Sequence, residues 1–233
     1  MHRLESVYSF LLQAYGPQGW WPLIGLDNKQ SVNITKSGSL KGYHPRDYSY
    51  PKTKAQRFEI CVGAILTQNT AWPNVERALF QLQKLNILSP QQILDSKIDS
   101  IQQAVRPAGY YNQKAKKLKV FAEFYISLKG KTPTRQQLLE LWGVGPETAD
   151  SMLLYAFKVP TFVVDAYTKR ILCHLGLCDS NTSYDEVKSL FEKTLKPDLK
   201  VYQEFHALLV EHAKRYYYKR PYGELCPLRM IGE

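Results

Sequence analysis

The sequence lacks any apolar run long enough to cross a membrane. A membrane-spanning helix takes roughly 20 consecutive apolar residues, and no segment of the 233-residue chain approaches that length. The first residues, MHRLESVYSFLLQAYG, place Leu4, Tyr8 and Leu11 at helical spacing but interrupt them with Glu5 and Gln13. This pattern predicts an amphipathic core helix rather than a signal peptide, and a cytoplasmic protein with no membrane partner.

Cysteine is scarce, and its spacing does not match the common metal-binding motifs. The four cysteines are Cys61, Cys173, Cys178 and Cys226, and they show no paired metal-ligand spacing. Cys61 stands in the apolar stretch FEICVGAIL, which favours a buried thiol. We therefore expect no metal site, and thiols that stay reduced in a cytosolic chain.

Signals for β-strands are nearly absent, since TFVV before residue 165 is too short to define a sheet. Apolar residues recur at helical spacing almost everywhere else, so the predicted fold class is all-α. Helices are predicted over 90–96, 98–105, 135–141, 146–157 and 166–175, and a capping box from Ser183 to Glu186 begins another. The stretch 26–56 is polar, contains glycine and proline, and has no periodicity; it is predicted to be a surface loop.

Positive charge is abundant. The formal net charge is +10, and the chain carries 16 Tyr, 9 Phe and 4 Trp. A basic protein rich in aromatic residues indicates a polyanionic partner, most simply nucleic acid. A basic surface that contacts only solvent would give the same charge balance, so the sequence motifs are needed to distinguish the two interpretations.

A glycine-containing hairpin is the first such motif. In LWGVGPETAD, Gly143 and Gly145 allow a tight turn, Val144 can anchor it in the interior, and Pro146 suits the first turn of a helix. The backbone N–H groups from Gly145 to Thr148 then point outward at a helix N-terminus, where phosphate binds. The alternative is an ordinary connection between two helices.

A single carboxylate follows the hairpin and its second helix. Asp165 ends the apolar run VPTFVV and precedes AYTKRIL, which has helical character. It can simply cap that helix. The combination of a phosphate-binding hairpin, a helix and then one aspartate favours a catalytic carboxylate instead.

Together these segments resemble a known family. LWGVGPETAD and VVDAYTKR are similar to the helix-hairpin-helix, Gly/Pro–Asp superfamily of DNA repair glycosylases, in its endonuclease III-like branch. AILTQNT and GYYNQKAKKL match further stretches of that branch, so the resemblance covers Phe58 to the C-terminus. YGPQGWWPL resembles the narrower 3-methyladenine DNA glycosylase III group.

The resemblance implies a two-domain fold with the active site in the cleft between the domains. A helical barrel of residues 57–159 would contain the hairpin, and residues 1–25 and 160–233 would form a second, discontinuous domain carrying Asp165. Double-stranded DNA with a damaged base would lie across the cleft of a monomer. The residues that we expect to bind it are Gly143, Val144, Gly145, Glu147, Thr148 and Lys169.

Two departures from the family pattern narrow the chemistry. Bifunctional members carry a lysine where this chain has Glu147, and a carboxylate cannot form the imine that leads to strand cleavage. Glu147 also suits the first turn of a helix for electrostatic reasons alone. Iron–sulfur members end in C-x6-C-x2-C-x5-C, but counting from Cys226 as the third ligand gives Tyr216, Gly223 and Gly232 at the other positions. We expect no cluster and no other cofactor.

The base pocket is predicted from residue types. A glycosylase extrudes its target nucleotide into a pocket, and indoles select cationic alkylpurines by stacking and cation–π attraction. The candidates are Trp20, Trp21, Gln68, Asn69 and Trp72, although a Trp-Trp pair more often packs between helices.

The sequence therefore predicts a monofunctional DNA glycosylase that excises 3-methyladenine-type bases in base excision repair. Two alternatives stay open. One is a mismatch or oxidised-pyrimidine glycosylase, with or without lyase activity; the other is a non-catalytic DNA-binding protein.

Overall fold

The computed structural model describes residues 3–26 and 42–231, and throughout these ranges the regular structure is helical, with no strand. The α-helices are α1 (Arg3–Tyr15), α2 (Lys54–Leu66), α3 (Trp72–Lys84), α4 (Pro90–Asp95), α5 (Ile98–Val105), α6 (Tyr111–Ser127), α7 (Arg135–Leu139), α8 (Pro146–Ser151), α9 (Ala166–His174), α10 (Tyr184–Thr194) and α11 (Leu199–Tyr216). The all-α prediction is confirmed. None of the described helices is both long and apolar enough to span a bilayer.

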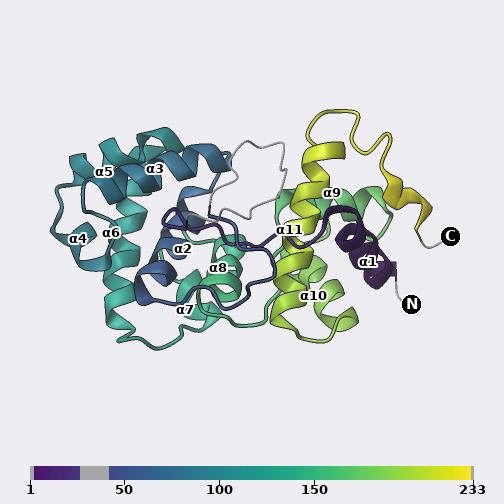
Figure 1. Cartoon of the computed structure of the whole chain (residues 1–233), viewed down its shortest axis with the longest axis horizontal. Coiled ribbons are helices and arrows are strands. Elements are labelled where there is room, and N and C mark those ends of the chain that lie inside the picture. The colour runs from purple at the N-terminus through teal and green to yellow at the C-terminus, as the bar shows by residue number, and fades with distance from the viewer. Residues whose placement is uncertain (1–2, 27–41, 232–233) are drawn as a thin grey trace.

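The helices form two groups, which lie at opposite ends of the molecule in Figure 1. In the first group, α2 to α6 contact one another and α2 also contacts α8. In the second, α11 contacts α1 and α9, and α1 also contacts α10. This arrangement is compatible with the predicted division near residue 160, whose domain boundaries remain a prediction.

Helix α2 packs into the first group through its C-terminal half, which is apolar on all sides. Thr53 accepts a hydrogen bond from the Gln56 backbone N–H, and the Gln56 side chain accepts from the Thr53 N–H, which forms a capping box. From Ile60 to Leu66 every residue is buried. A helical segment that is hydrophobic all round must be covered on all sides. The position of its C-terminal end is therefore fixed, and with it that of the TQNT segment at residues 67–70.

The segment predicted as one helix over 146–157 changes geometry midway. Helix α8 ends at Ser151, and residues Met152–Ala156 form a short π-helix, η2. The Phe157 N–H donates to the Met152 carbonyl at 3.0 Å, five residues back. This widened turn contacts both α2 and α11, and therefore connects the two groups of helices.

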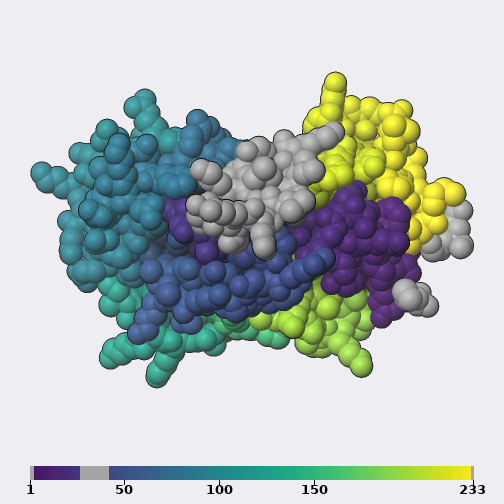
Figure 2. Space-filling view, viewed as in Figure 1, coloured from purple at the N-terminus to yellow at the C-terminus, as the bar shows by residue number. Residues whose placement is uncertain are grey.

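The N-terminal segment after α1, predicted to belong to the second domain, also contacts helix α2 of the first group. The Ile24 N–H donates to Glu59 Oε1 of α2 at 2.7 Å, and a Cβ on Gly63 of α2 would lie 3.0 Å from the Trp21 indole nitrogen. Figure 2 shows the N-terminal residues and those near position 50 on one face of the molecule, extending over both ends.

The predicted surface loop over 26–56 is only partly on the surface. Residues 27–41 lie outside the described residues, whereas Tyr43 and His44 are buried. His44 Nε2 lies 3.0 Å from the Trp21 carbonyl oxygen, and the Leu23 N–H donates to the Gly42 carbonyl at 3.0 Å. The end of this segment therefore packs against Trp21 and Leu23 of the N-terminal segment, and α2 begins at Lys54.

A buried ion network fixes α8 to α10. Asp150 is fully buried, receives two hydrogen bonds from Arg135 at 2.9 and 3.2 Å, and receives a third from the Tyr184 hydroxyl at 2.9 Å. Lys188 Nζ lies 3.6 Å from the same carboxylate. Because a buried charge is tolerated only when it is paired and hydrogen-bonded, this network constrains the position of α8 relative to the second group.

Candidate active site

The glycine hairpin lies between α7 and α8, as predicted. Gly143 has φ +83°, a conformation that favours glycine, and a Cβ there would also displace the Lys117 side chain, whose Cε would lie 2.4 Å away. Val144 is buried, as expected for an anchor, and its N–H donates to the Leu141 carbonyl at 3.0 Å. Gly145 and Pro146 begin α8. The hairpin is therefore fixed from the inside and presents its backbone outward.

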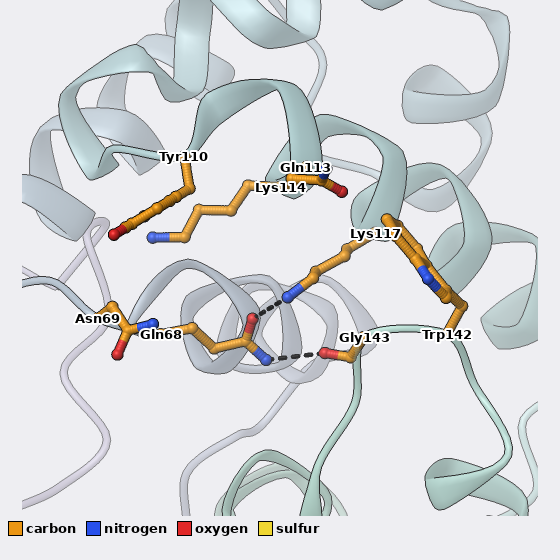
Figure 3. Close-up of a pocket in the computed structure, with 8 residues that line it drawn as sticks. All are labelled: Gln68, Asn69, Tyr110, Gln113, Lys114, Lys117, Trp142 and Gly143. Atoms are coloured by element: carbon orange, nitrogen blue, oxygen red, sulfur yellow. Dashed lines mark hydrogen bonds between the residues drawn. The ribbon is translucent and has the colours of Figure 1, made fainter.

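Gln68 holds the hairpin from the end of α2. Its Nε2 donates to the Gly143 carbonyl at 2.9 Å and to the Thr148 hydroxyl at 3.0 Å, and its Oε1 accepts from Lys117 Nζ at 2.5 Å. Figure 3 shows this chain of contacts running from Lys117 through Gln68 to Gly143. The amide predicted to contact bases thus bonds to the protein on both sides and holds the hairpin, and its contact with a base stays a prediction.

A surface cavity of about 320 Å³ opens beside this contact. It is lined by Gln68, Asn69, Tyr110, Gln113, Lys114, Lys117, Trp142 and Gly143. Two of these residues are exposed aromatics that sequence reasoning missed: Tyr110 is 68% and Trp142 52% exposed. Trp20, Trp21 and Trp72 do not line this cavity, so the five predicted pocket residues divide between two places.

Asp165 is the N-cap of α9. Its Oδ1 accepts a hydrogen bond from the Thr168 N–H at 2.7 Å, which places the carboxylate at the positive end of the helix. Its Oδ2 lies 3.9 Å from Nε2 of His206 on α11, and its side chain is 14% exposed. The capping interpretation and an outward-facing carboxylate oxygen are therefore both present in one residue.

Glu147 faces the same space as Asp165 from the other group of helices. Its side chain is exposed to solvent, yet desolvation by the surrounding protein, followed by the charge of Asp165, raises its pKa to about 7. These two observations agree if Glu147 lies on the wall of an open groove, where water reaches it but protein surrounds it. Glu147 at the start of α8 is therefore near enough to Asp165 at the start of α9 for the charge of Asp165 to raise its pKa.

Aromatic rings form the other wall of the site. Trp20 lies edge-on to His206 with ring centroids 5.5 Å apart, and 6.2 Å from Tyr155. Trp21 is buried and packs edge-on against Trp72 at 5.7 Å. Trp20 is partly exposed. It is therefore the member of the Trp-Trp pair that solvent reaches, whereas Trp21 lies in the core and Trp72 is itself partly exposed.

His206 and Tyr155 are site residues that the sequence did not reveal. Both are buried, and Tyr155 Oη lies 2.7 Å from His206 Nδ1. Helix α11 contains two buried histidines, His206 and His212, and the sequence pattern does not mark either of them as functional. Only the packing of α11 against η2 and the start of α9 places His206 and Tyr155 next to Asp165.

The amine of Lys169, predicted to contact DNA, is hydrogen-bonded within the protein. Its Nζ donates to the Thr182 carbonyl at 2.5 Å, on the side of α9 that faces α10. Contact with DNA would require this bond to be exchanged for a phosphate, and it stays a prediction.

The C-terminal residues do not fit an iron–sulfur cluster. Cys226 is buried, and its Sγ lies 3.1 Å from Nε2 of His212. Tyr216 and Gly223 occupy the two preceding ligand positions and have no thiol. A four-iron cluster takes four thiolates, and no group of three or more metal-binding side chains occurs among the described residues.

Comparison with known proteins identifies the family. Residues 62–197 match the family described as "HhH-GPD superfamily base excision DNA repair protein". The chain belongs to this HhH-GPD superfamily. The matched segment contains the hairpin and Asp165, which are the two features that the sequence motifs single out.

HhH-GPD relatives agree over most of the chain. It is 40% identical, over 97% of its length and 94% of the relative's, to a protein of Methanocaldococcus jannaschii named as a DNA repair glycosylase. It is 28% identical to endonuclease III of Thermotoga maritima, over 72% of this chain and 78% of that protein. The likeness to endonuclease III confirms the branch inferred from the motifs.

One solved HhH-GPD structure is similar in both fold and sequence. It is the 3-methyladenine DNA glycosylase (MagIII) of Helicobacter pylori bound to 1,N6-ethenoadenine, with a TM-score of 0.62 and 31% identity. The match covers 68% of this chain and 85% of that one. Base excision repair glycosylases with a helix-hairpin-helix are therefore the group to which this chain is similar at the level of fold, motif and sequence.

Proposed function

We propose that this protein is a monofunctional DNA glycosylase that removes cationic alkylated purines of the 3-methyladenine type from double-stranded DNA, acting as a monomer without an iron–sulfur cluster. The observation that carries the proposal is the position of Trp20, which contacts His206 and Tyr155 beside Asp165. A partly exposed indole next to the carboxylate suits a flat, positively charged base.

The chemistry of such a base fits a site with Asp165 as its main charge. Methylation at N3 or N7 makes the purine cationic, so the base leaves with the glycosidic electron pair and becomes neutral. No strong acid is needed to protonate the leaving group. The sugar becomes positively charged as the bond breaks, and Asp165 is placed to stabilise that charge. The likeness to the Helicobacter pylori 3-methyladenine glycosylase supports this choice of substrate.

A lesion panel tests the proposal directly. Duplexes carrying 3-methyladenine, uracil opposite guanine, or thymine glycol are incubated with excess enzyme, and the released base is measured against the spontaneous rate in buffer. We expect 3-methyladenine to be released at least 100-fold faster, relative to its own spontaneous rate, than uracil or thymine glycol, because only the first is cationic. Undamaged adenine in the same duplex serves as the internal control.

The same lesion panel distinguishes the two alternative functions from the proposed one. Preferred release of uracil or thymine glycol would replace the substrate by a mismatched or oxidised pyrimidine. Binding to all the duplexes without release of any base would identify a DNA-binding protein that lacks activity.

Glu147 leads to a prediction about strand cleavage. Because a carboxylate cannot form an imine with the abasic sugar, borohydride should trap no covalent complex between the protein and a substrate duplex. The abasic product should stay uncut until alkali is added. The measurement is a denaturing gel of the labelled strand with and without borohydride.

The variant Glu147→Lys provides the matched positive control. It places an amine where bifunctional relatives carry lysine, and we expect it to yield a trapped complex. A complex trapped with the unmodified protein would contradict the prediction. In that case Lys214, whose pKa is lowered by burial and which lies near Asp165, would be replaced first to locate the amine.

Gly145 leads to a prediction about DNA affinity. Its φ is −94° and nothing lies within 4 Å of an added Cβ, so side chains are accommodated there. Gly145→Asp should weaken binding to damaged and undamaged duplexes alike, on the order of tenfold, because it places a carboxylate at the phosphate-facing helix end. Gly145→Asn, an equally good N-cap, should bind like the wild type.

The same titrations repeated at several salt concentrations add a second criterion. Affinity should fall linearly with salt on a logarithmic scale, since phosphate contacts release counterions. An affinity that does not change with salt, or an Asn variant as weak as the Asp variant, would show that the hairpin does not bind through phosphate.

A further inference from the structure

One ring nitrogen of His206 lies within hydrogen-bond distance of a protein group, and the other has no hydrogen-bond partner among the described residues. The residue is 4% exposed on α11. Its Nδ1 lies 2.7 Å from the Tyr155 hydroxyl. Within the described part of the chain, its buried Nε2 has no hydrogen-bond partner. A buried polar atom without a partner is uncommon in native proteins, and here it lies beside the candidate catalytic carboxylate.

The Tyr155 hydroxyl determines which nitrogen of His206 carries the proton. It has one hydrogen and donates it to the Gln203 carbonyl oxygen at 3.2 Å, a group that can only accept. We assign the hydroxyl's one hydrogen to this carbonyl, so that towards His206 the hydroxyl accepts and Nδ1 carries the proton; the nitrogen-15 measurement below tests this assignment. Burial lowers the pKa of His206, and the attraction of Asp165 only partly offsets this. This lowered pKa favours the neutral imidazole, and with the proton assigned to Nδ1, Nε2 presents a lone pair.

That lone pair faces a second acceptor. Asp165 Oδ1 is already bonded to the Thr168 N–H at 2.7 Å, and Oδ2 lies 3.9 Å from His206 Nε2. This distance is too long for a direct hydrogen bond, and two acceptors cannot bond each other. A donor with two hydrogens satisfies both. A water oxygen about 2.8 Å from each atom would see them at roughly a right angle, which its two O–H bonds can span.

We propose that His206 and Asp165 together hold the water molecule that attacks the sugar during base release, with His206 accepting its proton. The inference rests on the proposed hydrolytic function. With both hydrogens of the water directed at Nε2 and Oδ2, its lone pairs face the remaining open side, where the sugar beside Asp165 would lie. Water is chosen over a group of the base because the open position adjoins Asp165, the partner of the sugar.

The step balances without a further reactant. The bond between the anomeric carbon and the base nitrogen breaks, and its electron pair neutralises the cationic purine. The water oxygen bonds to the anomeric carbon, and one of its protons moves to Nε2 of His206. The imidazolium that forms is stabilised by Asp165 at 3.9 Å and returns its proton to solvent after the product leaves.

Trp20 and Tyr155 keep this arrangement rigid. Trp20 packs edge-on against the imidazole at an interplanar angle of 90°, and the Tyr155 ring lies 5.8 Å from it. Rotating the ring by a half turn would break the bond to Tyr155. The orientation of Nε2 towards Asp165 is therefore set before any substrate binds.

The tautomer can be measured independently of activity. Nitrogen-15 NMR of the histidine-labelled protein near pH 7 should show His206 protonated at Nδ1 and unprotonated at Nε2. The signal is assigned by its disappearance in His206→Phe. In Tyr155→Phe the preference for Nδ1–H should weaken. An imidazolium, or a proton on Nε2 in the wild type, would overturn the inference.

The kinetic test compares His206→Phe and His206→Gln with the wild type on the lesion duplex that the wild type processes. Phe keeps the ring shape and should lower single-turnover base release about 100-fold. Gln can present an amide oxygen to the water and should recover part of that loss. Affinity for a duplex carrying a cationic pyrrolidine in place of the sugar should change by less than threefold, because Asp165 is intact.

A competing nucleophile separates positioning of water from a structural effect. In buffer containing methanol, the wild type should form mainly the hydrolysed sugar. His206→Phe should form a larger share of the methyl glycoside, because it no longer orients water. If His206→Phe releases base like the wild type with an unchanged product ratio, the inference is wrong and the proposed function stands. If the wild type releases no base from any duplex, both are wrong.

Discussion

Replacing Asp165 by asparagine should lower single-turnover base release by roughly a thousandfold, which is the scale expected when a group aimed at the transition-state charge is lost. The carboxylate acts mainly after the glycosidic bond begins to break, so it contributes little to the binding of intact DNA. Affinity for the lesion duplex should therefore be equal to that of the wild type or slightly tighter, because a negative charge is removed from the DNA-facing groove.

Asparagine makes this a clean test because it preserves the cap. Asp165 Oδ1 accepts the Thr168 N–H at 2.7 Å, and an asparagine oxygen makes the same bond with nearly the same preference at an N-cap. Asp165→Ala loses both functions and should also unfold more easily, by about 1 kcal/mol. If Asp165→Asn keeps full activity, Asp165 is a cap and no catalytic residue. If it melts like the alanine variant, the charge itself stabilises α9.

Local signals in the sequence were enough to place most helices. The predicted range 98–105 coincides with α5, and the capping box from Ser183 to Glu186 begins α10. Cap residues and apolar spacing act within a few residues, so a sequence shows them directly. The predicted helix over 146–157 is different, because a run of buried residues from Met152 to Ala156 looks the same in α and π geometry.

The site was less predictable because it depends on contacts between distant segments. The motifs correctly located the hairpin. They did not reveal that the Gln68 side chain donates hydrogen bonds to Gly143 and Thr148. The WW pair was singled out, yet only the packing of Trp21 beneath α2 shows that Trp20 is the exposed member. His206 gave no signal at all, since a histidine within a buried helix is usually a core residue, and His212 lies in the same helix.

The two groups of helices each supply residues of the candidate site, so the proposed catalysis requires their relative position to be fixed. Glu147 comes from α8, whereas Asp165 and His206 come from α9 and α11. The buried Asp150 joins α8 to Tyr184 and Lys188 of α10, and η2 packs on both sides. A shift of either group would change the spacing of the carboxyl groups, to which catalysis is sensitive.

Trp20 leads to the second large expected effect, on lesion choice. Stacking of a base on an aromatic ring contributes about 1–3 kcal/mol, and each 1.4 kcal/mol corresponds to a tenfold change. Trp20→Ala should therefore slow release of 3-methyladenine by roughly 10- to 100-fold. A neutral base gains less from the indole, because the cation–π part of the attraction is missing. Release of a neutral base should therefore fall less in this variant, so that the ratio of cationic to neutral base release decreases.

One other tryptophan and a conservative variant of Trp20 serve as controls for that experiment. Trp142 is 52% exposed and lines the cavity on the hairpin side, away from the aromatic wall; Trp142→Ala should leave the ratio of 3-methyladenine to uracil release unchanged even if it weakens DNA binding. Trp20→Phe keeps a ring and should retain part of the preference. Trp21 is unsuitable as a control because it is buried, and its truncation would cost about 3–5 kcal/mol of stability. If Trp20→Ala remains folded and preserves the wild-type ratio, recognition of the cationic base does not occur at this indole, and the aromatic wall serves only to hold His206 in place beside Asp165.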